Sequence, residues 1–368
     1  MSGPLAGLRV VEMAGLGPCP MAGQFLADLG ADVVVIDRAA DVDISQEINR
    51  RGKRSVVLDL KSAGGRDAAL ALIARADVLI EGFRPGVMER LGLGPSDCAA
   101  VNPGLVYGRM TGWGQEGPLA ASAGHDLTYL ALTGALWAMG EPDRPPRPPL
   151  NLVADYGGGA MFLLLGVLAA LWERERSGRG QVIDAAMIDG VSALLALQHT
   201  LRARGLWTDR RGDNWFDGAA PWYRCYACRD GKFLAVAAFE PEFFAEFLRI
   251  AGLPGDWVGR QMDRAAWPAM AEAIAARIAE RDRDDWAALF EGADACAGPV
   301  LDWEEALRHP QMAARGVLAR RDGLIQPMPA PRFSRTPARA GPLGRRTGQD
   351  SAAILAGLRA GAAPEGEA

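Results

Sequence analysis

Short β-branched runs alternate with helix-patterned segments through the N-terminal part of the chain, and this alternation limits the possible folds more than any other feature. Runs rich in Val, Ile and Leu predict strands at residues 8–13, 31–37, 55–60, 77–83 and 104–113. Helical spacing predicts helices among them, at residues 22–30 and 65–76. Strand, helix and strand in this rhythm indicate βαβ units, and therefore an α/β fold with a parallel sheet. Such sheets bind their ligands at the carboxyl ends of the strands.

The rest of the chain indicates a second, smaller domain. Residues 124–201 have a helical pattern, and the apolar run at 160–172 predicts a buried helix that is too short to span a bilayer. From Trp207 the pattern changes to aromatic-rich strands around an Asp-Gly turn, followed by helices. We therefore expect two domains. Their ranges are 1–200 for a large Rossmann-like domain, about 330–368 for a C-terminal segment that joins it, and 201–329 for a small α+β domain.

The composition of the 368-residue chain excludes several classes of protein. A net charge of −5 and a pI near 5.4 argue against general binding of nucleic acid or of an anionic membrane, since both need a dominant basic surface. Five widely scattered cysteines, an odd number, indicate no disulfide framework and favour a reducing compartment. The N-terminal sequence lacks the pattern of a signal peptide, so we expect a cytoplasmic protein with no nucleic-acid or membrane partner.

A glycine-rich turn after the first strand is similar in part to a dinucleotide-binding sequence. In AGLGPCPMAGQ the third glycine of the G-x-G-x-x-G pattern would fall at Pro20, although Asp37 lies about where such a site places its ribose carboxylate. Proline suits the first turn of a helix, but it puts the close approach of a pyrophosphate in question. We favour a Rossmann-like scaffold without NAD, and an NAD-dependent oxidoreductase is the alternative.

The pair Cys225-x-x-Cys228 could form half of a zinc site. No second Cys or His pair lies nearby at ligand spacing, so a set of four ligands cannot be completed. We interpret both cysteines as strand residues and expect no metal.

Three residues are candidates for acid/base chemistry. His125 lies at a predicted helix start, directly before Asp126 and just after the parallel-sheet region; the alternative is an ordinary semi-buried histidine. Asp155 precedes three consecutive glycines, which a simple helix cap does not need and which suggest close packing against the backbone. Glu240 lies between a strand and a helix, where a first-turn carboxylate is the alternative.

Basic residues gather in the βαβ region, several of them just after predicted strands. They could form a rim that binds the phosphates of a nucleotide-bearing ligand, or they could be an ordinary solvated surface. These residues are Arg38, Lys53, Arg54, Lys61, Arg84 and Arg90.

Taken together, these motifs resemble the alpha-methylacyl-CoA racemases, within the family III CoA-transferase superfamily. The likeness covers nearly the whole chain. It lies in GPLAGLRVVEMAGLGPCPMAGQFLADLGADVVVIDR, NRGKRSVVLDLK, EGFRPGVMERLGLGP, TGWGQEGP, AGHDLTYLALTGAL, NLVADYGGG, GQVIDAAMIDG, YRCY, FEPEFF and PVLDWEEALRHPQMAARG. The GHD motif together with the later aspartate points to the racemase branch.

The resemblance implies a fold, an activity and a set of roles. His125 and Asp155 would be the two acid/base groups, Glu240 would support His125, and the N–H of Asp126 would stabilise an enolate. The residues that would bind coenzyme A are Arg38, Lys61, Arg84, Arg90 and Tyr129. The family's fold is a large Rossmann-like domain with a smaller one, in an interlocked homodimer whose site lies between subunits.

The implied reaction is racemisation of a 2-methylacyl-CoA thioester. It needs no cofactor, since coenzyme A is part of the substrate. The strongest alternative is a CoA-transferase that uses Asp155 as its nucleophile, and a catalytically silent binder of CoA esters is a third possibility.

Overall fold

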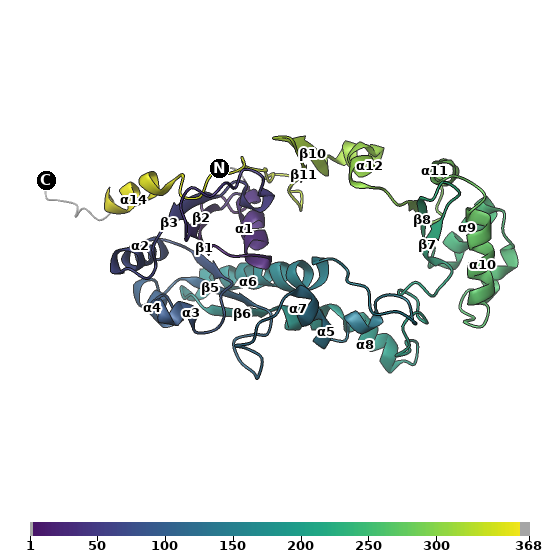
Figure 1. Cartoon of the computed structure of the whole chain (residues 1–368), viewed down its shortest axis with the longest axis horizontal. Coiled ribbons are helices and arrows are strands. Elements are labelled where there is room, and N and C mark those ends of the chain that lie inside the picture. Colours follow the sequence, from purple (N-terminus) through teal and green to yellow (C-terminus); the bar gives the residue numbers. More distant parts are fainter. Residues whose placement is uncertain (1–2, 361–368) are drawn as a thin grey trace. The chain divides into compact units, whose positions relative to one another are not determined.

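The computed structural model describes residues 3–360, which divide into two compact units (Figure 1). Unit 1 consists of the described residues up to Thr133, of Leu150–Leu194, and of those from Pro310 onward. Unit 2 consists of Gly134–Pro149 and Leu195–His309. Each unit has its own core and is described separately.

Unit 1 is built on a six-stranded parallel sheet, as the βαβ rhythm predicted. Its strands, in the spatial order β3-β2-β1-β4-β5-β6, are β1 Arg9–Met13, β2 Asp32–Asp37, β3 Arg54–Val57, β4 Val78–Glu81, β5 Val106–Thr111 and β6 Val182–Ala186. This is the order of a doubly wound sheet. The chain first adds strands outward from β1 to β3, and then returns to add β4, β5 and β6 on the other side of β1. Strand β6 lies in a region that we expected to be helical. It forms because Val182–Ala186 pairs in parallel with Tyr107–Thr111 of β5.

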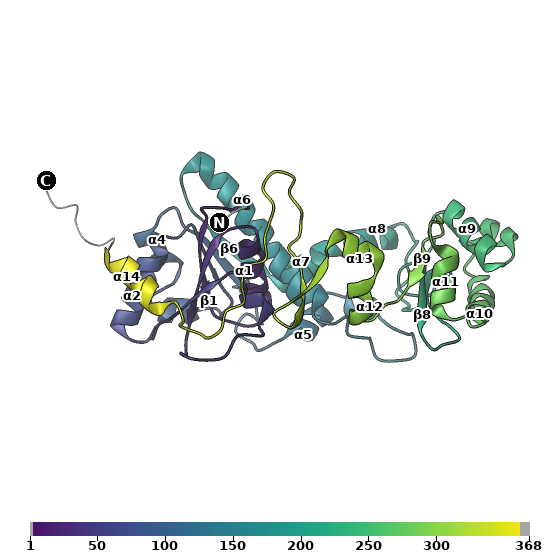
Figure 2. The ribbon, with the colours of Figure 1, turned by 90° about the horizontal axis from the view of Figure 1, so that it is seen from above.

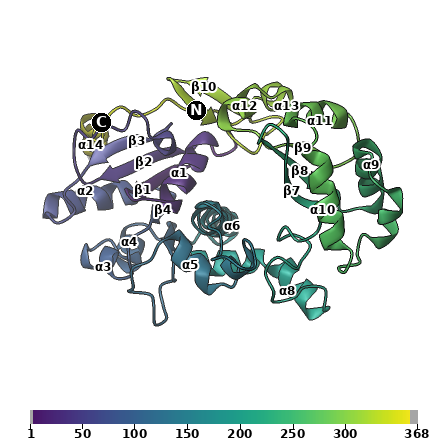
Figure 3. The same ribbon diagram turned by 45° about the vertical axis from the view of Figure 1, so that its right-hand side comes forward.

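Helices cover both faces of this sheet (Figure 3). The helices of unit 1 are α1 Pro18–Asp28, α2 Ala63–Ile73, α3 Val87–Arg90, α4 Pro95–Val101, α5 Asp126–Leu132, α6 Met161–Ser177, α7 Met187–Leu194, α13 Pro310–Arg315 and α14 Ser351–Ala360, with η1 Ile48–Arg50 and the π-helix η3 Leu152–Ala160. On one face, Val34, Ile73, Tyr107 and Ile354 belong to a core that α2, α4 and α14 share with the strands. On the other face α1 packs against β1, β2 and β4, and α6 packs against β5 and β6.

The C-terminal segment returns to unit 1 through polar contacts that are at least partly buried. Arg51 forms an ion pair of 2.6 Å with Asp28, both side chains being 1% exposed, and donates a further hydrogen bond to the carbonyl of Pro327. The carboxylate of Asp350 accepts the N–H of Ser55, on the edge strand β3. These contacts tie the hairpin β10 Leu318–Arg321 and β11 Leu324–Pro327, and then α14, to the N-terminal half of the unit (Figure 1).

Unit 2 is an α+β unit, as expected (Figure 2). Its antiparallel sheet contains β7 Tyr223–Ala227, β8 Phe233–Ala237 and β9 Ala297–Pro299. Its helices are α8 Ala196–Ala203, α9 Pro241–Ala251, α10 Trp267–Ile278, α11 Arg283–Phe290 and α12 Trp303–Arg308, with the short turns η2 Leu136–Ala138 and η4 Gly255–Arg260. Alternate strand residues Tyr226, Leu234 and Val236 enter one apolar core with Phe247 and Trp286 of the helices.

The observed units differ from the expected domain ranges in three stretches. Residues 134–149 belong to unit 2 because Arg211 donates hydrogen bonds to the carbonyls of Trp137, Glu141 and Arg144. Residues 195–200 also belong to unit 2. Residues 310–329 belong to unit 1, where the β10–β11 hairpin contacts Arg51.

Helix α6 was expected to be buried, and that expectation is wrong for one of its faces. Leu163, Leu164, Val167 and Ala170 are buried. The opposite face carries a stripe of exposed apolar residues, with exposed fractions of 51% for Met161, 62% for Leu165, 40% for Leu168 and 70% for Trp172. The helix is also longer than the apolar run suggested.

With η3, helix α6 forms a continuous helical stretch, Leu152–Ser177, that is long and apolar enough by length and composition to cross a membrane. Core helices of soluble proteins pass the same test, and α6 packs on β5 and β6.

Candidate active site

A cavity of about 450 Å³ opens at the carboxyl-end edge of the parallel sheet in unit 1. Among its lining residues, those that the sequence singled out are His125, Asp155, Arg84 and Tyr129. Three loops that follow β1, β4 and β5 also contribute, since residues 15–17, 82–85 and 112–113 line the cavity. Two candidate acid/base residues therefore share one cavity, in the place where a parallel sheet is expected to bind its ligand.

His125 is an exposed residue at the N-cap of helix α5, not a semi-buried histidine. Its backbone N–H donates to Thr128 Oγ1 at 2.9 Å, and Thr128 Oγ1 donates to the His125 carbonyl at 2.7 Å. This exchange fixes the backbone of the turn. Within residues 3–360 the imidazole itself has no hydrogen-bond partner, so the ring is available to a ligand.

Tyr129 holds the same turn through a hydrogen bond and ring packing. The side chain is 9% exposed, and its hydroxyl donates a hydrogen bond to the carbonyl of Gly124. The ring meets Trp113 edge to face, with centroids 4.7 Å apart. A Cβ atom on Gly112 would lie 2.0 Å from the ring and one on Gly124 would lie 2.4 Å from it, so the packing needs both glycines. Tyr129, expected to bind coenzyme A, thus contacts the backbone that precedes His125.

We expect Tyr129→Phe to lower the free energy of unfolding by about 1 kcal/mol, because the change leaves the Gly124 carbonyl without its donor while keeping the ring. Urea denaturation would measure the change. Tyr156→Phe is the matched control in the same unit, since no described residue hydrogen-bonds to the Tyr156 hydroxyl. Equal losses in the two variants would show that the Tyr129 hydrogen bond adds nothing to stability.

Asp155 is a half-buried residue in the π-helix η3. Burial raises the pKa of its carboxyl, and the nearby Asp126 carboxylate raises this pKa further. A hydrogen bond from Asn151 Nδ2 to Asp155 Oδ2, 3.3 Å long, and the charge of His125 both act to lower it. The backbone N–H of Asp155 donates to Asp126 Oδ1 at 2.7 Å. Asp126 therefore links the start of α5 to η3 and keeps His125 and Asp155 together in the cavity wall.

The glycines that follow Asp155 allow a close backbone contact, as predicted. A Cβ atom on Gly158 would lie 2.7 Å from a methyl carbon of Val191, and one on Gly190 would lie 2.0 Å from the Gly158 carbonyl oxygen. Helix α7 therefore packs directly on the backbone of η3. π-Helical segments are rare and are often found at functional sites, and this one, of nine residues, carries Asp155.

The glycine-rich turn lies against Asp155. Gly17 has a φ of 72°, and a Cβ atom there would lie 3.3 Å from Asp155 Oδ2. The ribose-binding role suggested for Asp37 is wrong. Its carboxylate is 4% exposed, forms an ion pair with Arg50 at 2.6 Å and accepts the hydroxyl hydrogen of Ser55.

The predicted basic rim is only partly assembled. Arg84 lines the cavity and is exposed, and Arg38, Lys61 and Arg90 are exposed outside its lining. Lys53 is not at the rim at all, because it is buried. Arg54, on the edge strand, pairs with Asp32.

Lys53 and Glu12 form a buried ion pair that sequence reasoning missed. Their charged atoms are 2.6 Å apart, each side chain is 1% exposed, and Lys53 also donates to the carbonyl of Pro20 at 2.9 Å. Burial raises the pKa of Glu12 and lowers that of Lys53. A carboxylate within an apolar strand, Glu12 between Val11 and Met13, was the available signal. The pair anchors the first turn of α1, next to the cavity.

Glu240 belongs to unit 2, at the N-cap of α9. It is absent from the lining of the cavity in unit 1. The fold places it at a strand-to-helix junction, as the sequence indicated.

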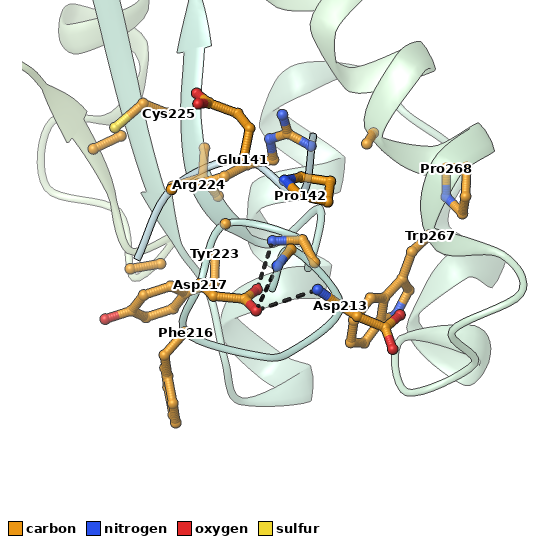
Figure 4. Close-up of a pocket in the computed structure, with 18 of the residues that line it drawn as sticks. Glu141, Pro142, Asp213, Phe216, Asp217, Tyr223, Arg224, Cys225, Trp267 and Pro268 are labelled. Atoms are coloured by element: carbon orange, nitrogen blue, oxygen red, sulfur yellow. Dashed lines mark hydrogen bonds between the residues drawn. The ribbon is translucent and has the colours of Figure 1, made fainter. Parts of the chain in front are cut away.

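Unit 2 has a larger, more open cavity of about 1050 Å³, shown in Figure 4. The Asp217 carboxylate there accepts the backbone N–H groups of Gly212, Asp213 and Asn214. Glu141, on its wall, pairs with Arg147 at 3.0 Å. Its carboxylates thus hold loops and side chains in place, and nothing there matches the His/Asp arrangement of unit 1.

The cysteine pair gives no metal site in the described part of the chain. Cys225 is exposed on β7 and Cys228 is buried just beyond it. Within residues 3–360, no group of three or more His, Cys, Asp or Glu side chains could hold a metal ion.

Comparisons with known proteins give a consistent result. The sequence profile described as CoA-transferase family III matches residues 5–347. The chain is 46% identical over 335 residues to "Alpha-methylacyl-CoA racemase" of Mus musculus, covering 91% of this chain and 87% of the relative. It is 43% identical over 336 residues to the protein of the same name in Homo sapiens, with the same coverage.

Among solved structures, a CAIB/BAIF family protein from Brucella suis is 30% identical, with a TM-score of 0.83, and the match covers 97% of this chain and 100% of that one. Profile, sequence and fold agree over nearly the full length of the chain. The protein therefore belongs to CoA-transferase family III.

Proposed function

We propose that the protein racemises 2-methylacyl-CoA thioesters, with His125 and Asp155 as the acid/base pair. The observation that carries the proposal is that both side chains line one cavity at the sheet edge, in a chain 46% identical to a protein named as such a racemase. The acyl-CoA would be the only organic reactant.

The reaction needs one base on each face of the α-carbon. One group removes the α-proton, and the electron pair of that C–H bond moves toward the thioester oxygen to give an enolate. The other group, already protonated, returns a proton to the opposite face, so the net change is inversion. His and Asp suit this because burial raises the pKa of Asp155 toward that of an imidazole.

The enolate oxygen needs a hydrogen-bond donor. The backbone N–H of Asp126 is the proposed donor, because it has no acceptor among the described residues while the neighbouring His125 N–H is taken by Thr128. Donors of this kind often contribute as much as acid/base catalysis. The Asp126 carboxylate keeps the turn in place through its bond to Asp155.

Arg84 is the best-placed residue for the phosphates of coenzyme A, since it lies exposed in the lining of the cavity. Arg38, Lys61 and Arg90 remain proposed contacts of the nucleotide end. Glu240 remains a proposed support of the imidazole.

Proton NMR of a 2-methylacyl-CoA in deuterated water tests the proposal. We expect the protein to exchange the α-proton and to convert each epimer of the thioester into the other. A CoA-transferase would instead move CoA to an added free carboxylic acid, with Asp155 forming an acyl anhydride. A silent binder would bind the thioester and exchange nothing.

The exposed face of α6 supports a homodimer as the working form. Met161, Leu165, Leu168 and Trp172 are spaced at intervals of four, three and four residues, which places them on one side of the helix. An apolar stripe of this length is expected to be covered by protein. A second copy of the chain is the proposed cover, and a cytoplasmic location with no membrane contact is proposed with it.

We expect the double variant Leu165→Glu/Trp172→Glu to be monomeric at micromolar concentration, because two carboxylates would have to be buried in the interface. Light scattering after size-exclusion chromatography measures the mass. Val101→Glu, which puts a carboxylate on an exposed apolar residue of α4 instead, is the control and should stay dimeric. A dimeric double variant would contradict the assignment of this face.

A further inference from the structure

Leu16 is an apolar residue of the cavity lining whose side chain is exposed to solvent. It lines the cavity and is 92% exposed. It lies in the loop between β1 and α1, and the buried ion pair of Glu12 and Lys53 anchors both ends of that connection. A leucine held so far into solvent loses the benefit of burial until something apolar covers it.

The position of Leu16 is set by its neighbours. Gly17 adopts a positive φ and lies against the Asp155 carboxylate. A Cβ atom built on this glycine would lie 3.3 Å from Asp155 Oδ2. Leu16 is therefore the neighbour of a glycine on which a Cβ atom would contact a proposed acid/base group. An occupant of the cavity that reaches Asp155 also reaches the lip that carries Leu16.

The remaining walls nearby are apolar as well. Phe83, Met110 and Met187 line the same cavity. The exposed cation at the cavity, Arg84, follows Phe83 in the loop after β4. The cavity thus offers a cationic contact for a phosphorylated ligand together with apolar contacts for hydrocarbon.

We propose that Leu16 is a specificity-determining residue, which packs against the acyl chain of the thioester beyond its α-carbon. The inference rests on the proposed racemase function and adds a preference to it. Long acyl chains cover Leu16 and gain binding energy from it, whereas short ones do not reach it. The covered leucine also keeps water away from the enolate beside Asp155.

The test compares two substrates in two variants. For Leu16→Ser we expect kcat/KM to fall about tenfold with 2-methyldecanoyl-CoA and to change less than about twofold with 2-methylbutanoyl-CoA, as one apolar contact is typically worth that much discrimination. Leu16→Met should restore the preference for the long chain. Val101→Ser, an exposed apolar residue of α4 outside the cavity lining, is the control and should leave both values unchanged.

Four other outcomes would overturn the inference. An equal fall of kcat/KM with both substrates, or no fall with either, would show that Leu16 does not discriminate between acyl chains of different length. Either result would leave the racemase proposal intact. A change of mass in light scattering with Leu16→Ser would show that a second copy covers the leucine instead. A wild-type protein that exchanges the α-proton of neither substrate would remove the racemase proposal, and this inference with it.

Discussion

We expect His125→Ala to reduce the rate of epimer interconversion by about 10²–10⁴-fold, the usual contribution of one positioned acid/base group. The imidazole lies exposed in the cavity wall, and its backbone, not its ring, makes the contacts that hold the turn. The substitution therefore removes a proton carrier and leaves the fold in place. Conversion between the two epimers, followed by chiral analysis, measures the effect.

Two controls accompany this variant. Its unfolding transition should match that of the wild type, because the His125 ring makes no hydrogen bond within residues 3–360. His199→Ala, in helix α8 of unit 2, removes a histidine outside the cavity lining and should keep full activity. Near-wild-type exchange of the α-proton in His125→Ala would refute the assignment of the imidazole.

Asp155→Asn should cause a loss of the same size. The amide keeps the shape of the side chain and can still contact Asn151, but it cannot accept a proton. Epimer interconversion is again the measurement. If wild type and variant differ only in CoA transfer to a free acid, and not in interconversion, Asp155 acts as a nucleophile and the transferase alternative is correct.

The pH profile of the wild type bears on the same residue. Because burial raises the pKa of Asp155, its carboxyl takes up a proton at a higher pH than the free value of about 4. A protonated Asp155 cannot remove the α-proton, so the direction of the reaction in which it acts as the base is lost as the carboxyl titrates. The acidic limb of the rate profile is therefore expected above pH 4.

Much of the sheet could be predicted because the local sequence of each central strand already indicates a strand. Runs such as ADVVVID are buried on both sides, as central parallel strands must be, and they form strand β2 as expected. Strand β6 was missed because VIDAA is too short and mixed to indicate a strand by itself. It exists through its pairing with β5, a contact that local pattern does not contain.

The misjudged face of α6 has a related cause. Met161, Leu165 and their neighbours are as apolar as the buried residues of the helix, so the pattern shows no difference between the two sides. Burial by the sheet and exposure of the stripe become distinguishable only in the folded unit. The ranges of the two units were similarly hidden, since the contacts of Arg211 with residues 137–144 join distant parts of the sequence.

The positions of the candidate residues followed the sequence where a simple rule applied, and departed from it where burial decided. His125 and Asp155 follow the rule that parallel sheets bind ligands at one edge, and they line one cavity. Lys53 follows the same sequence logic as its neighbours but is buried with Glu12. Nothing local to NRGKR distinguishes a rim residue from a core residue.

The return of the C-terminal segment to unit 1 has a consequence for synthesis. Ser55 and Arg51 meet their partners Asp350 and Pro327 at separations of 295 and 276 residues. The edge of the parallel sheet at β3 is thus completed only by residues that are made 295 positions later. Until they are made, the nascent chain carries an open strand edge, which is when chaperones would protect it most.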